Sequence, residues 1–189
     1  MTVALRSRST LAAMLASLTM WVAGRAQVVA STAGESESDG PKITGFAPLD
    51  YFQNQCARCH GDYGAAYGDK FAKNITYEQL QKFVRDMAEG PAQAPLNDPD
   101  LALETDFHRA LRDKQPFAVA VAWKDGVLSG EALPGSKLRL EHDGKSVEVV
   151  LDGPAWQVSL PAATAWETVV LHVENDGKKA AIPLGKRAF

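Results

Sequence analysis

The sequence Cys56-Ala57-Arg58-Cys59-His60 contains both cysteines of the 189-residue chain. Two thiols this close together could form a local disulfide or a redox-active dithiol. The histidine that follows them indicates a different chemistry, because Cys-x-x-Cys-His is the spacing at which a polypeptide attaches haem. The two thiols form thioethers with the two vinyl groups of one haem, and the adjacent histidine supplies the proximal nitrogen to the iron. The motif therefore predicts one covalent haem c bound by Cys56, Cys59 and His60.

The region from residue 42 to residue 114, on both sides of this motif, has the sequence pattern of helices. Thr76 and Gln79 match the capping box that opens many helices. The apolar side chains that follow recur with helical spacing, and they are Leu80, Phe83, Val84, Met87 and Ala88. A further helix is predicted from about residue 99 to residue 114. The surroundings of the motif are therefore predicted to be helical.

This helical region resembles the small monohaem class I cytochrome c domain over roughly residues 45–112. Besides the motif, the resemblance depends on an aromatic residue four positions before the first cysteine, Phe52. It also depends on a Leu-x-x-x-Val pattern at Leu80 and Val84, and on an aromatic residue in the last helix, Phe107. The resemblance implies an all-α fold around one haem, with one haem edge exposed for electron exchange.

The sequence departs from this class at the distal side of the iron. The class commonly carries its distal ligand in a Met-Pro pair before the last helix, whereas this chain has Ala94-Pro95 there. Met87 is the only methionine beyond the first 26 residues, and its thioether suits an electron carrier. His60 and Met87 are therefore the predicted iron ligands. His108 on the last helix is the next candidate for the distal position, and an open sixth position is the third possibility.

The sequence pattern changes at Pro116 from helical spacing to alternation. Apolar residues then recur every second position in several short stretches, separated by turn signals such as Asp143-Gly144. Roughly six or seven short strands, with turns about every 8–12 residues, predict a β-sandwich over residues 116–189. The predicted fold class is thus α + β with two domains, an all-α cytochrome c domain at 42–114 followed by an antiparallel β-sandwich.

The first 26 residues have the order of a secretory signal peptide, with basic residues, a short apolar run and then small residues. The apolar run is shorter than the ~20 residues needed to cross a bilayer. Removal of residues 1–26 leaves 17 basic side chains against 23 acidic ones, so the formal net charge moves from −3 to −6. Residues 27–41 are polar and acidic and are predicted to form a flexible linker.

These features predict a periplasmic or otherwise extracytoplasmic protein with no membrane span after leader cleavage. An acidic chain is unsuited to binding nucleic acid, because it would repel the phosphate backbone. The predicted function is single-electron transfer to and from a redox partner protein, without an enzymatic activity. Two alternatives stay open: a haem-based gas sensor or enzyme with an open sixth iron position, and an adhesion or assembly module whose β-sandwich is the functional part.

Overall fold

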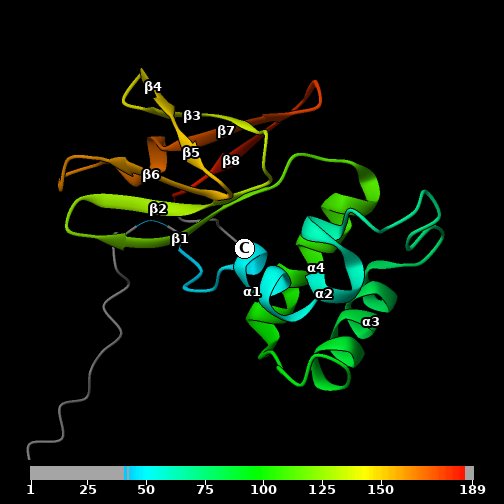
Figure 1. The fold of residues 1–189 in the computed structure, drawn as a ribbon. Coiled ribbons are helices and arrows are strands. Elements are labelled where there is room, and N and C mark those ends of the chain that lie inside the picture. The colour runs from blue at the N-terminus through cyan, green and yellow to red at the C-terminus, as the bar shows by residue number, and fades with distance from the viewer. Residues whose placement is uncertain (1–40, 42, 186–189) are drawn as a thin grey trace, which may run out of the picture. The chain divides into compact units, whose positions relative to one another are not determined.

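The computed structural model describes Pro41 and residues 43–185, and all of these belong to one compact unit (Figure 1). The predicted signal peptide at 1–26 lies outside the described residues, as does the predicted linker at 27–41 except for Pro41. Within the described part, helices occupy the first half of the chain and strands the second.

The four helices are α1 (Pro48–Gln55), α2 (Ala57–His60), α3 (Tyr77–Glu89) and α4 (Asp98–Asp113). The predicted capping box opens α3: the Thr76 hydroxyl accepts from the Gln79 amide at 3.3 Å, and the Gln79 side chain accepts from the Thr76 amide at 2.8 Å. The Asn97 side chain caps α4 by accepting from the amide of Asp100 at 2.9 Å. The two longer helices therefore begin where local side chains satisfy their first amides.

The eight strands form two four-stranded antiparallel sheets. One sheet has the order β1 (Ala118–Lys124), β2 (Val127–Ala132), β6 (Ala155–Ser159) and β5 (Leu151–Asp152). The other has the order β4 (Lys145–Val149), β3 (Lys137–His142), β7 (Val170–Asn175) and β8 (Lys178–Pro183). Buried side chains from both sheets form one apolar cluster, which includes Leu128, Trp156, Leu140 and Leu171.

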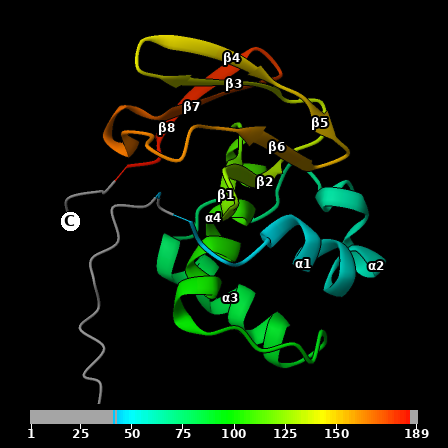
Figure 2. The same cartoon turned by 90° about the vertical axis from the view of Figure 1, so that its left-hand side faces the viewer.

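The helices pack against β1 and β2, on the side away from the second sheet (Figures 1 and 2). A second apolar cluster joins Phe52 of α1 and Phe107 of α4 to Phe117 and Val119 at the start of β1. The ring centroids of Phe52 and Phe107 are 5.3 Å apart, and those of Phe107 and Phe117 are 5.5 Å apart. The helical half and the first sheet therefore share a core.

One buried carboxylate also connects the helical half to the sheet. Glu131 of β2 accepts hydrogen bonds from the amides of Leu49, at 2.8 Å, and Asp50, at 3.0 Å. The N-cap residue of α1, Ala47, has no side chain that could do this. The first turn of α1 is thus completed by a residue about eighty positions further along the chain.

The predicted fold class, an all-α cytochrome c domain at 42–114 followed by an antiparallel β-sandwich, is wrong. The described residues contain four helices, two of them with eight residues or fewer, against eight strands in two antiparallel sheets. They form no sizeable all-α domain. The physical reason is that the short helices α1 and α2 do not enclose a core alone, so Phe117, Val119 and Glu131 from the strand half complete it.

Candidate functional site

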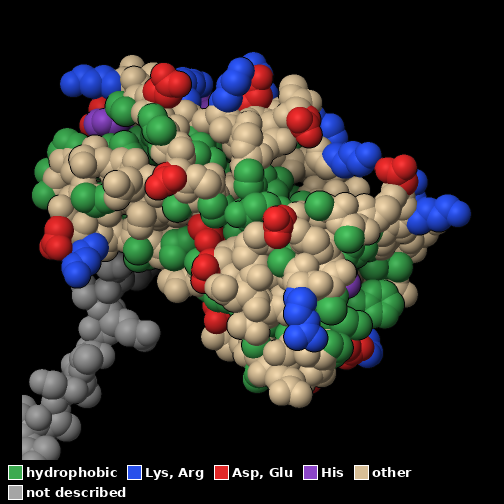
Figure 3. Space-filling model, viewed as in Figure 1, with side chains coloured by type: hydrophobic (Ala, Val, Ile, Leu, Met, Phe, Trp, Pro, Cys, Tyr) green, Lys and Arg blue, Asp and Glu red, His purple; other side chains and the backbone are tan. Residues whose placement is uncertain are grey.

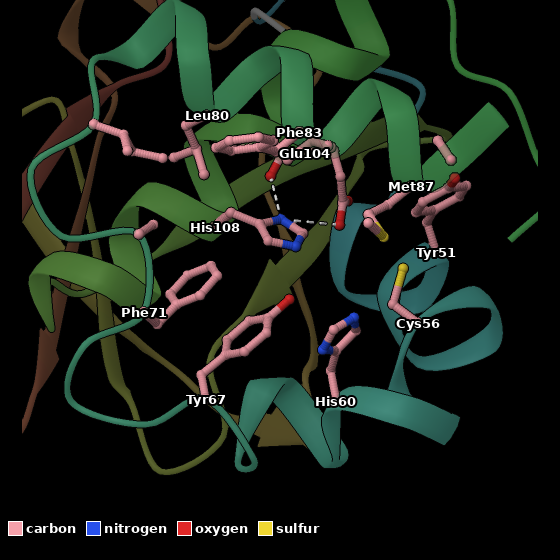
Figure 4. Close-up of a pocket in the computed structure, with 14 residues that line it drawn as sticks. Tyr51, Cys56, His60, Tyr67, Phe71, Leu80, Phe83, Met87, Glu104 and His108 are labelled. Carbon is pink, nitrogen blue, oxygen red and sulfur yellow. Dashed lines mark hydrogen bonds and ion pairs between the residues drawn. The ribbon is translucent and has the colours of Figure 1, made fainter. Parts of the chain in front are cut away.

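A cavity of about 420 Å³ lies among the helices and the segment between α2 and α3 (Figure 4). This volume is in the range of sites that bind small molecules and cofactors. Its wall is largely apolar and aromatic, and α3 contributes the largest share, with Leu80, Phe83, Val84, Met87 and Ala88. The predicted amphipathic helix therefore turns its apolar face to this cavity.

Two of the large apolar side chains on α3 are open to solvent. Phe83 is 52 % exposed and Met87 is 47 % exposed, although both line the cavity. Figure 3 shows hydrophobic side chains gathered on the surface over this part of the helical half. A flat apolar group held in the cavity would cover side chains that the protein itself leaves exposed.

The motif residues take different positions relative to this cavity. Cys56, between α1 and α2, is half-buried and lines the wall, and His60 at the end of α2 also lines it. Cys59 is exposed and is not among the lining residues. Both thiols are free. Burial raises the pKa of Cys56 to about 11, with smaller contributions from Glu104 and Cys59, so its thiol is neutral at ordinary pH.

Met87, the predicted distal iron ligand, and His108, the next candidate for that position, also line the cavity. The structure therefore brings Met87 and His108 to the same space as Cys56 and His60. In Figure 4, the His108 ring enters from α4 and points toward the side where His60 and the Tyr67 hydroxyl lie. The Met87 thioether points toward the side of Cys56.

His108 is held by its own helix. It is 7 % exposed, and its Nδ1 lies 2.9 Å from the main-chain oxygen of Glu104, one turn earlier. A carbonyl oxygen can only accept, so Nδ1 carries the proton and Nε2 keeps a lone pair. The pKa of His108 is lowered to about 4, mainly by burial; the hydrogen bond to Glu104 opposes this effect and nearby His60 adds to it. The ring is therefore neutral at ordinary pH.

Glu104 is the residue that sequence reasoning missed. Its side chain is fully buried in the cavity wall, with Oε1 3.4 Å from Nδ1 of His108. Within the described part of the chain, neither of its carboxyl oxygens has a hydrogen-bond partner. Burial raises the pKa of Glu104 well above its usual value, and Glu131 adds to this. The i, i+4 spacing of Glu104 and His108 was the available signal, because it places both on one face of a helix.

Aromatic side chains complete the wall between α2 and α3. The rings of Tyr67 and Phe71 stack with centroids 3.8 Å apart and planes within 2° of parallel. The Tyr67 ring also lies 5.0 Å from that of His60. Burial raises the pKa of Tyr67, followed in size by the effects of Cys56 and Glu104, so the hydroxyl stays protonated. This stacked pair gives the cavity a flat wall beside the motif histidine.

The residues of the cavity fit a covalently attached haem. They supply a motif thiol, a motif imidazole, apolar and aromatic walls, and a second imidazole with a free ring nitrogen. Among the described residues there is no cluster of three or more His, Cys, Asp or Glu side chains for a free metal ion. A haem iron needs no such cluster, because the protein provides only its axial ligands.

No protein-family model matches the chain, and no curated protein matches it significantly. In the part of the chain that the structure describes, none of the helices has the length and apolar character needed to cross a bilayer.

Proposed function

We propose that this protein is a monohaem c-type cytochrome that transfers single electrons outside the cytoplasm. The observation that supports the proposal is that Cys56 and His60 of the Cys-x-x-Cys-His motif line one apolar cavity. A disulfide or dithiol site does not require an apolar cavity beside the histidine, whereas a covalently attached haem does. The predicted signal peptide and the acidic net charge agree with an exported carrier.

In this function Cys56 and Cys59 would hold the haem through thioethers, and His60 would bind the iron on its proximal side. When bound, the haem supplies the one-electron chemistry. Leu80 and Val84 of α3 exclude water from one side of the cavity, which keeps its interior at a low dielectric constant. The exposed part of Phe83 lies at the rim, where a redox partner protein would approach.

Covalent attachment is tested with the full chain, produced together with a haem-attachment system. We expect the purified protein to keep its haem on a denaturing gel and to gain the mass of one haem. The double variant Cys56→Ala, Cys59→Ala should lose the covalent haem, whereas His172→Ala, on β7, should keep it. Isolation of native protein with a Cys56–Cys59 disulfide would refute the proposal.

Electron transfer is tested separately on the haem-loaded protein. A redox titration should show one reversible one-electron step, and the reduced protein should pass its electron to an oxidised small cytochrome without other reactants. An irreversible titration, or a reduced form that consumes oxygen catalytically, would contradict a carrier.

One observation favours a second candidate function, a haem enzyme or gas sensor with an open sixth position. Glu104 and His108 form a buried acid–base pair in the cavity wall, which is the type of pair that could assist chemistry on an iron ligand. Carbon monoxide binding separates the two functions. Rapid and complete binding by the ferrous protein supports the open site, and resistance to carbon monoxide supports the carrier.

A further inference from the structure

His108 is buried, and one nitrogen of its ring is hydrogen-bonded to the main chain while the other keeps a lone pair that could bind a metal. The protein holds Nδ1 through the main-chain oxygen of Glu104 at 2.9 Å and places the Glu104 carboxyl at 3.4 Å from the same nitrogen. Metal-binding histidines commonly have this arrangement, in which a hydrogen bond to one nitrogen fixes the ring and the lone pair of the other. Nε2 faces the cavity that also contains His60 (Figure 4).

The aromatic contacts of His108 restrict its ring to this orientation. Its centroid lies 5.5 Å from that of Phe52 and 5.7 Å from that of Phe107, both in edge-to-face geometry. On the cavity side, the Tyr67 ring is 6.0 Å away. The His108 ring therefore packs against Phe52 and Phe107, its Nδ1 is hydrogen-bonded, and its Nε2 is directed toward the cavity.

Met87 offers a weaker arrangement for an axial ligand. Its side chain is 47 % exposed, so much of it lies at the mouth of the cavity, and it points toward Cys56 (Figure 4). The segment between α3 and α4 contributes no residue to the described wall, and the main-chain oxygen of Ala94 accepts a hydrogen bond from the Tyr51 hydroxyl at 2.6 Å. The last helix therefore supplies the better-placed donor.

We propose that His108 is the distal iron ligand, so that His60 and His108 bind the haem iron from its two sides, and that Glu104 is the positioning residue of His108. This inference rests on the proposed function, because it requires the covalent haem. Two imidazoles give a lower reduction potential than an imidazole with a thioether, because the thioether favours reduced iron. The hydrogen bond from Nδ1 to the main-chain oxygen of Glu104 increases the basicity of His108 and lowers the potential further, and the carboxyl oxygen 3.4 Å from the same nitrogen acts in the same direction.

The test uses the haem-loaded full chain and first establishes covalent haem by mass and by a denaturing gel. If no haem is attached, the proposed function fails, and the inference fails with it. If haem is attached, the oxidised spectrum decides the ligand. We expect a six-coordinate low-spin spectrum without the long-wavelength methionine–iron band.

Variants then identify the ligand. His108→Ala should convert the iron to a high-spin form, and added imidazole should restore the low-spin spectrum. A residue with a merely structural role would not be replaced by free imidazole. Met87→Leu should keep the wild-type spectrum, as should His172→Ala on β7. If His108→Ala fails to fold, His108→Met provides the same information, because it should create the methionine–iron band that wild type lacks.

Glu104→Gln tests the positioning residue. The main-chain oxygen stays in place, so the spectrum should remain low-spin while the reduction potential rises. An unchanged potential would overturn the role of the Glu104 carboxyl. A methionine–iron band in wild type that Met87→Leu abolishes would overturn the assignment of His108, as would a high-spin wild-type protein with covalent haem.

Discussion

Cys56 and Cys59 belong to one motif but differ as single residues. Cys56 lines the cavity with a pKa of about 11, raised mainly by burial, whereas Cys59 is exposed. The thiolate is the reactive form of cysteine, so the buried thiol is the slower nucleophile at ordinary pH. The two cysteines of the motif therefore differ in burial and in reactivity, which their spacing in the sequence does not show.

Alkylation of the haem-free protein should reveal this difference. With iodoacetamide at pH 8, we expect Cys59 to be modified first, as followed by peptide mass spectrometry. The rate at Cys56 should rise roughly tenfold per pH unit up to about pH 11, because it follows the thiolate fraction. In urea the two rates should become similar. Equal rates in the folded protein would contradict the burial of Cys56.

Gly130 is a second residue whose environment allows little change. It lies in β2, where an added Cβ would overlap the main-chain oxygen of Val119 and the ring of Trp156. Gly130→Ala should therefore lower the free energy of unfolding by about 1–3 kcal/mol, measured by urea titration, because overpacking forces the sheet apart. Gly68→Ala is the matched control, since its Cβ would meet nothing within 4 Å. Equal stability of the two variants would contradict the close approach at Gly130.

At the scale of elements, α1 depends on β2 for its first turn. The amides of Leu49 and Asp50 have the Glu131 carboxylate as acceptor, and burial of Leu49 removes water as a substitute. Negative charge at a helix N-terminus is also favourable. The contact therefore determines both the stability of α1 and its position on the sheet.

Glu131→Ala should destabilise the protein by about 1–3 kcal/mol, because it leaves a buried amide donor without an acceptor. The measurement is the midpoint of urea unfolding. Glu148→Ala, at an exposed position of β4, should change the free energy of unfolding by less than about 0.5 kcal/mol. A Glu131→Ala variant as stable as this control would show that water replaces the carboxylate.

Most individual elements could be predicted from local sequence, and their assembly could not. The capping box at Thr76 located α3, the second helix prediction at 99–114 matches α4, and Asp143-Gly144 forms the turn between β3 and β4. The contact of Glu131 with α1 could not be predicted, because no local pattern pairs residues about eighty positions apart. The predicted all-α domain was wrong for the same reason.

The candidate site was predictable only where a motif defined it. Cys56, Cys59 and His60 follow from their spacing, and Met87 stays a prediction as an iron ligand. The importance of Glu104 and His108 depends on how α4 packs against α1 and the Tyr67–Phe71 pair. The i, i+4 spacing places this histidine and glutamate on one face of the helix, but it does not show that both are buried at a cavity until that packing is known.

At the scale of the whole molecule, the shared core couples the helical half to the sheets. Phe117 and Val119 are buried against Leu49, Phe52 and Phe107. Neither half can therefore unfold without exposing apolar surface of the other. The predicted boundary lies between residues 114 and 116, and this core contains residues from both sides of it.

Unfolding should therefore be a single cooperative transition. Helical circular dichroism reports on the first half, and the fluorescence of Trp123, Trp156 and Trp166 reports on the strand half. The two signals should change at the same urea concentration. Phe117→Ala should lower the free energy of unfolding by about 3–5 kcal/mol, as other large core truncations do. Both midpoints should therefore move together to a lower urea concentration.

The exposed Val150 provides the control, since Val150→Ala removes no core contact and should leave both midpoints in place. Two separate transitions in wild type, or a Phe117→Ala effect on only one signal, would show that the halves fold independently.

The hydrogen bonds between Glu131 and α1 also affect the order in which the chain can fold during synthesis. Leu49 leaves the ribosome 82 residues ahead of the carboxylate that accepts its amide hydrogen. At roughly 5–20 residues per second, synthesis needs about 4–16 s to reach β2. During that interval the amides of Leu49 and Asp50 lack the carboxylate that accepts them in the folded protein, so α1 cannot complete its first turn in this way until β2 has been made.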